Sequence, residues 1–129
     1  MMFTLKKAVY LLPLMISTVW TSTVAAAEKP ESPAYYVAEF QVHDRPAMKP
    51  YSEQVESTFK PFSGRYIARG GKLLPLEGDV LKGGVIIIQF DSLAQAQAWY
   101  DSPAYAKLKP IRHQAATSHV FIIGSSPKS

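Results

Sequence analysis

The sequence predicts an α+β domain whose strands and helices follow the order β-α-β-β-α-β. Apolar and polar residues alternate over 34–43, which is typical of a strand with two different faces. Apolar residues recur at helical spacing after Asp44 and again after Ser92, and both residue types suit a helix N-cap. A β-branched run at 85–90 indicates an interior strand. This order is that of the ferredoxin-like fold, a four-stranded antiparallel sheet with helices on one face.

The first 27 residues predict a secretory signal peptide. Lys6 and Lys7 precede an apolar run that ends in small residues, which suits cleavage after Ala27. The alternative is an uncleaved N-terminal membrane anchor, because the stretch from Ala8 to Ala27 is just long enough to span a bilayer. We therefore expect a periplasmic or secreted protein with no stable membrane span once the signal is cleaved.

The remaining chain is long enough for one domain with a modest core. The full sequence has 14 Lys and Arg residues, and 12 of them remain without Lys6 and Lys7, against 10 acidic residues. No basic run is interleaved with aromatic residues, so we expect no nucleic-acid partner. The chain has no cysteine, and stability must come from packing or oligomerisation. The expected divisions are a signal peptide at 1–27, a flexible lead-in at 28–33, the domain at 34–124 and a polar tail at 125–129.

The first strand, expected over Ala34 to His43, leads into a helix that contains a proline. Asp44 and Pro46 are typical of a helix start. A proline deep inside a helix costs about 3 kcal/mol. We therefore expect a short turn, followed by a helix whose regular part begins near Pro50 and ends at Pro61.

The second strand carries an unusual pair of arginines. Arg65 and Arg69 stand four residues apart with Ile67 midway, so in a regular strand all three side chains project from one face. Glycines bracket this strand and indicate turns. A loop over 72–82 then leads to the third strand.

The last part of the domain is helical before the final strand. Ser92 begins a helix through a capping box. Ser102 and Pro103 interrupt it and restart a helix that we expect to continue to Ala115. The final strand is expected at 118–123, and the spatial order of the strands is expected to be 4-1-3-2.

Alternation sorts the strand residues into two faces. One face is apolar throughout and should lie under the helices, whereas the other mixes apolar and polar side chains. Because a half-apolar exposed sheet normally meets a partner, we expect a homodimer through the uncovered face. The cavity enclosed by two copies would be lined by Glu39, His43, Arg69, Gln89 and His119.

Three segments resemble a known family. They are Ala68-Arg69-Gly70-Gly71, Leu76-Glu77-Gly78-Asp79 and Trp99-Tyr100-Asp101-Ser102-Pro103-Ala104-Tyr105. In these segments the chain is similar to the domain of unknown function 1330 family (DUF1330), a branch of the dimeric α/β-barrel superfamily. The resemblance implies the fold and dimerisation, but no established reaction. Gly84 departs from the family pattern, which has an arginine there, and this weakens an anion site that depends on that arginine.

Arg69 and Arg65 are the leading candidates for ligand binding, because a guanidinium can hold a carboxylate or phosphate through two parallel hydrogen bonds. The alternative is an ion pair with Glu39, Glu77 or Asp79 that only stabilises the sheet or the dimer.

Glu39 and His119 are the candidate catalytic residues. Either can serve as a base, with Arg69 stabilising developing negative charge. His43 and Gln89 are candidate ligand contacts in the same expected cavity.

Tyr100 and Tyr105 either donate hydrogen bonds at the pocket mouth or serve only as architecture. Histidine spacing matches no metal motif, so we expect neither a metal nor a cofactor.

Three hypotheses remain for the function. The first is a cofactor-independent enzyme, isomerase or monooxygenase-like, acting on a small polar organic molecule. The second is a non-catalytic small-ligand-binding domain of the cell envelope, and the third is a structural dimer.

Overall fold

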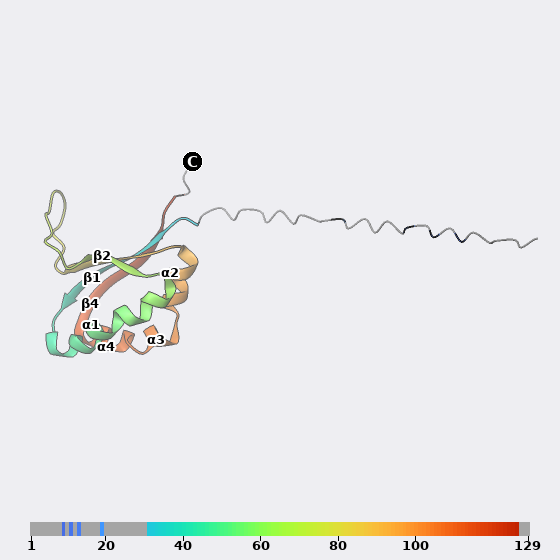
Figure 1. Ribbon diagram of the computed structural model, residues 1–129. Helices are drawn as coiled ribbons and strands as arrows, with labels where there is room; N and C mark the ends of the chain where they lie inside the picture. The colour runs from blue at the N-terminus through green and yellow to red at the C-terminus, as the bar shows by residue number, and fades with distance from the viewer. Residues whose placement is uncertain (1–8, 10, 12, 14–18, 20–30, 127–129) are drawn as a thin grey trace, which may run out of the picture.

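Four strands form one antiparallel sheet in the order β2-β3-β1-β4 in the computed structural model, which describes residues 9, 11, 13, 19 and 31–126. The strands are β1 (Ala34–Val42), β2 (Arg65–Arg69), β3 (Gly84–Phe90) and β4 (Ala116–Gly124). The helices are α1 (Arg45–Phe59), α2 (Leu93–Tyr100), α3 (Pro103–Ala106) and α4 (Lys109–Ala115), and they gather on one face of the sheet (Figure 1). The predicted fold class and strand order are confirmed. Most of the expected signal peptide and most of the polar tail lie outside the described residues.

The first helix is longer than the sequence suggests. Asp44 caps α1 by accepting a hydrogen bond from the Ala47 N–H at 2.9 Å, and the helix passes through Pro50. The prediction that its regular part begins near Pro50 is therefore wrong. Pro46 lies in the first turn, where its N–H is not needed, and Pro50 forgoes one bond near the exposed helix start.

The second helical segment is divided where a single helix was expected to continue to Ala115. It consists of α3 and α4, which are separated at Lys107 and Leu108. The first helical region ends in a 3-10 turn, η1 (Lys60–Phe62). Pro110 cannot donate the N–H that would continue the helix from Ala106, which explains the break. The final strand starts at Ala116, two residues earlier than predicted.

The core lies between the sheet and the helices and is rich in aromatic residues. Trp99 is fully buried, and its Nε1 donates to the Thr58 hydroxyl at 2.9 Å. The Tyr36 ring meets Trp99 edge-on with centroids 5.0 Å apart. Tyr36, Ile88 and Phe90 are buried, as expected for the helix-covered face.

A β-bulge interrupts the strand that carries the two arginines. Arg65 pairs with Gln89 and Tyr66 with Ile88, but the next pairs are Ala68 with Ile87 and Arg69 with Ile86. Ile67 is the extra residue, and a bulge of one residue reverses the faces of everything beyond it. The prediction that Arg65, Ile67 and Arg69 share one face is therefore wrong.

Within the described part of the chain, no helix is both long enough and apolar enough to cross a membrane.

Candidate functional site

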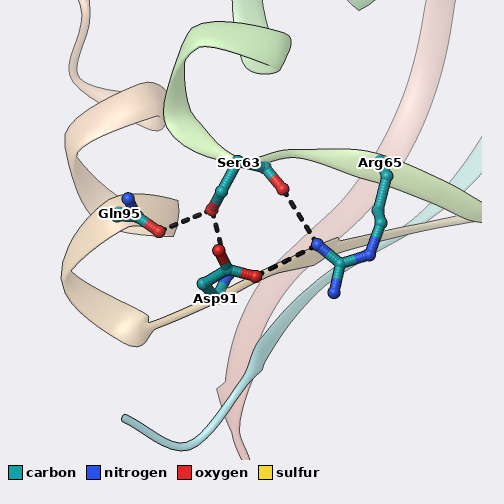
Figure 2. A network of polar contacts seen from close by, with 4 residues as sticks. All are labelled: Ser63, Arg65, Asp91 and Gln95. Atoms are coloured by element: carbon teal, nitrogen blue, oxygen red, sulfur yellow. Dashed lines mark hydrogen bonds and ion pairs between the residues drawn. The ribbon is translucent and has the colours of Figure 1, made fainter. Parts of the chain in front are cut away.

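Arg65 ties the start of β2 to the turn that follows β3 (Figure 2). Its Nη1 donates to the Ser63 carbonyl at 3.2 Å and to Asp91 Oδ1 at 3.1 Å. Ser63, in the left-handed conformation at φ 65°, donates its hydroxyl to Gln95 at 2.5 Å and accepts the Asp91 N–H at 3.0 Å. Arg65 is therefore held in an ion pair, as one alternative had it, but with Asp91 rather than with Glu39, Glu77 or Asp79.

The bulge at Ile67 directs Arg69 to the helix-covered side of the sheet, where it faces Ile86 in register. There the Arg69 Cζ lies 4.7 Å from the centroid of the Tyr66 ring, which is a cation–π contact. Arg69 lines a cavity of about 700 Å³ between α1 and the sheet. No carboxylate of the described chain forms an ion pair with it.

This cavity, which we call the α1 cavity, has an apolar floor and a cationic rim. Its floor consists of Tyr36, Phe40, Met48, Tyr51, Val55, Tyr66, Ile86 and Ile88. Its exposed basic residues are Arg45, Lys49, Arg69 and Lys82. The described residues that line it include no Asp, Glu or His. Of the four cations, Lys49 alone forms an ion pair within the described chain, with Glu53 at 3.7 Å. An anion with an apolar body fits this arrangement.

Three tyrosine hydroxyls meet behind the floor of the α1 cavity. The Tyr105 hydroxyl lies 3.0 Å from that of Tyr51 and 3.4 Å from that of Tyr36. Burial raises the pKa of Tyr36 and of Tyr51 well above the ordinary value, and the neighbouring Tyr105 adds to the effect. Both side chains therefore stay protonated at neutral pH. Tyr36 and Tyr51 contribute to the cavity floor, while their hydroxyls are bonded to Tyr105 behind it.

For Tyr105 and Tyr100 the sequence left open a place at a pocket mouth or a purely architectural role. Tyr105 is fully buried in the core rather than at a pocket mouth. Tyr100 is half-buried and lines a second, smaller pocket, where the Lys109 ammonium lies 3.8 Å above its ring centroid.

Glu39 and His119 do meet, but on the uncovered face of the sheet. His119 Nδ1 lies 3.5 Å from Glu39 Oε2, and the two residues are register partners on β1 and β4. The other oxygen, Glu39 Oε1, accepts the N–H groups of Lys82 at 3.0 Å and Gly83 at 3.1 Å. Glu39 thus fixes the end of the β2–β3 loop. Because Arg69 is on the opposite face, the expected grouping of Glu39 and His119 with this arginine is wrong.

His43 and Gln89 also lie outside the α1 cavity. His43 is exposed just beyond β1, and its backbone N–H donates to the Ala115 carbonyl at 3.0 Å. Gln89 is half-buried on β3, paired in register with Tyr35 and Arg65. Among the residues that the structure describes, no three His, Asp or Glu side chains are close enough to hold a metal ion.

Sequence reasoning did not assign the cations of α1, or the buried residues Tyr36 and Tyr51, to the site. Arg45 and Lys49 stand four residues apart on α1, but Pro50 favours a turn over this segment when only the sequence is considered. The spacing of Met48, Tyr51 and Val55 on one helix face was the available signal.

Comparisons with known proteins agree with this architecture. The family model described as "Domain of unknown function (DUF1330)" matches residues 33–125. A protein of unknown function from Rhodopseudomonas palustris, RPA0582, is 21% identical over 79% of this chain and 88% of its own, with a TM-score of 0.60. SnoaB, a cofactor-independent oxygenase from Streptomyces nogalater, is 15% identical over 75% of this chain and 96% of its own, with a TM-score of 0.54. No curated protein gives a significant match.

These likenesses show that the chain shares its fold with both proteins. They do not extend to a reaction, because identity to both solved structures is low. The family model, by contrast, covers nearly all of the domain. The chain therefore belongs to the family known as domain of unknown function 1330.

Proposed function

We propose that this protein binds a small organic anion with an apolar body in the α1 cavity. The observation that carries the proposal is the contrast between a floor of apolar and tyrosine side chains and a rim of four cations, with no carboxylate in the described lining. At about 700 Å³ the volume lies in the range of small-molecule sites, roughly 300 to 1,000 Å³.

Arg69 is the residue that fixes the anionic group. Stacking on Tyr66 orders its guanidinium, and no ion pair within the described chain competes for it. A guanidinium presents paired donors that match a carboxylate. The apolar floor beneath Arg69, which includes Met48, Val55 and Ile86, accommodates the apolar body of the ligand.

Catalysis in the same cavity is the second candidate. The fold shared with SnoaB, described as a cofactor-independent oxygenase, favours it. Glu39 and His119 lie on the other face of the sheet, so neither can act on a ligand held in this cavity. If a bound ligand is converted in air, the protein is an enzyme; if the ligand is recovered unchanged, it is a binding protein.

Two further proposals concern the export of the protein and its oligomeric state. We propose export through the N-terminal segment, on the strength of its basic, apolar and small-residue pattern. We also propose a homodimer through the uncovered sheet face, supported by exposed Ile67, Phe121 and Ile123 and by the superfamily fold.

The anion proposal is tested with 2-naphthoate and its uncharged analogue 2-naphthamide by isothermal titration calorimetry. We expect the carboxylate to bind at least about tenfold more tightly than the amide, which corresponds to about 1.4 kcal/mol. Arg69→Gln should abolish this preference. Arg65→Gln is the matched control, because Arg65 lies outside the cavity, and should retain it. Equal affinities for the acid and the amide in the unaltered protein would contradict the proposal.

A further inference from the structure

Arg112 on α4 is a buried cation without a counter-charge in the described chain. Only 2% of its surface is exposed. Nη1 donates to the Ser118 hydroxyl, Nη2 lies 3.2 Å from His113 Nε2, and Nε has no hydrogen-bond partner. Among the described residues, Nε is the single buried side-chain nitrogen or oxygen left unpartnered. None of the ion pairs in that part of the chain involves Arg112.

The surroundings of Arg112 keep it charged but do not neutralise it. Burial opposes the charge, yet the oxygens of neighbouring tyrosines, foremost Tyr105 and Tyr36, outweigh this and raise the pKa of the guanidinium. The Phe40 ring centroid lies 5.7 Å from Arg112 Cζ. None of these neighbours is a carboxylate. A buried charge is ordinarily paired, and leaving it unpaired is strongly unfavourable.

A polar pocket of about 490 Å³ opens beside this guanidinium, at the junction of α4 and β4. Its lining consists of Tyr100, Arg112, His113, Ala116, Thr117, Ser118 and Val120. Two of these side chains carry aliphatic hydroxyls, and none of the seven is a carboxylate. The Lys109 ammonium, placed over the Tyr100 ring, adds a second cation to the neighbourhood. We call this hollow the Arg112 pocket.

We propose that the Arg112 pocket is a second anion site that binds a small oxyanion, a carboxylate or inorganic phosphate, against Arg112 and Ser118. The guanidinium fork suits an oxyanion, since it offers several N–H donors in one plane. The hydroxyl of Ser118, which lies on the same face of β4 as Arg112, supplies a further donor. The site is separate from the α1 cavity, whose described lining does not include Arg112.

The decisive measurement is the Nε–H resonance of Arg112 in ¹H–¹⁵N NMR spectra of the purified full chain, assigned by its loss in Arg112→Lys. Inorganic phosphate and acetate are titrated at constant ionic strength, with chloride as the reference salt. We expect a saturable shift of the Arg112 signal with phosphate or acetate and none with chloride. The Nε–H of Arg65, an exposed arginine already paired with Asp91, should show no saturable shift.

Two variants distinguish oxyanion binding in the Arg112 pocket from binding in the α1 cavity. Ser118→Ala should weaken the response at least about fivefold while the chain stays folded, and Arg69→Gln should leave it unchanged. If Arg112→Lys does not fold, the signal is assigned by through-bond correlation and the Ser118→Ala comparison still decides. The proposal is overturned if neither oxyanion shifts the signal, if Arg69→Gln abolishes the shift, or if the signal responds only to protein concentration. That last result would mean that a second copy supplies the counter-charge.

Discussion

The two faces of the sheet are built from the same strands but have different relations to the rest of the chain. On the helix-covered face, Ile88 and Phe90 are buried and the α1 cavity is complete within one chain. On the uncovered face, Phe121 and Ile123 are exposed by 55% and 54% beside the Glu39–His119 pair. We therefore assign the proposed ligand binding to the first face and the proposed association of two copies to the second.

The largest effect that tests this contrast is expected when neighbouring residues of β3 are truncated and the free energy of unfolding is measured. Ile88 is 1% exposed on the helix-covered face, so Ile88→Ala should lower the free energy of unfolding by about 2 to 5 kcal/mol. Urea denaturation followed by tryptophan fluorescence measures the loss. Because the core of one chain holds Ile88, the loss should not depend on protein concentration.

Ile87→Ala is the matched change on the uncovered face, one residue away. Ile87 is only partly buried in a single chain, so truncation should cost less than at Ile88 when the protein is dilute. If two copies cover this face, the cost should grow with protein concentration. Equal and concentration-independent losses for both variants would remove the distinction between the faces.

A smaller effect concerns the tyrosines of the helix-covered face. The pKa of buried Tyr51 and Tyr36 is raised in the folded chain, whereas the pKa of a tyrosine in the unfolded chain is about 10. Their contribution to stability is therefore complete below about pH 10 and is lost as the pH rises above it. Each should reduce the free energy of unfolding by about 1.4 kcal/mol per pH unit in that window.

Tyr51→Phe removes one of the two protons involved. Urea unfolding measured between pH 8 and 11 should therefore show a shallower decline for the variant, by about 1.4 kcal/mol per pH unit. Tyrosinate absorbance, recorded in parallel, reports the protonation of the folded protein. An unchanged slope in Tyr51→Phe would show that this hydroxyl ionises as readily in the folded chain as in the unfolded one.

The architecture was predictable from the sequence because it depends on patterns spread over many residues. Alternation in β1, the β-branched run of β3 and the caps at Asp44 and Ser92 each indicate one element, and together they allow few topologies. Pro50 led to a wrong prediction of one helix boundary only. Near the exposed start of the helix this proline costs little free energy compared with what the burial of Tyr51 and Val55 contributes.

The site was not predictable because its position depends on one residue. Nothing in the stretch from Arg65 to Arg69 distinguishes a regular strand from a bulged one, yet the choice decides which face Arg69 occupies. The burial of Arg112 was not predictable for a similar reason. It follows Ile111 on a short helix, and its burial arises from packing against distant tyrosines that no local pattern reveals.

The smallest expected effect gives the sharpest test of the bulge. Deleting Ile67 removes the unpaired residue and leaves Tyr66, Ala68 and Arg69 facing the same partners on β3. Arg69 should then stay on the helix-covered face, and the affinity for 2-naphthoate should change by no more than about threefold, or about 0.6 kcal/mol. In a strand without a bulge, the same deletion would move Arg69 from one face to the other.

The contact between Arg69 and Tyr66 provides a readout that does not depend on any ligand. In the bulged strand both side chains lie on the helix-covered face, with the guanidinium 4.7 Å from the ring centroid. A nuclear Overhauser effect between the Arg69 side chain and the Tyr66 ring should therefore appear in the unaltered chain and persist after the deletion. In a strand without the bulge these two residues would be on opposite faces before the deletion and would meet only after it. An Overhauser effect that appears only in the deletion variant would mean that Arg69 lies on the uncovered face in the unaltered chain, the face that carries Glu39 and His119.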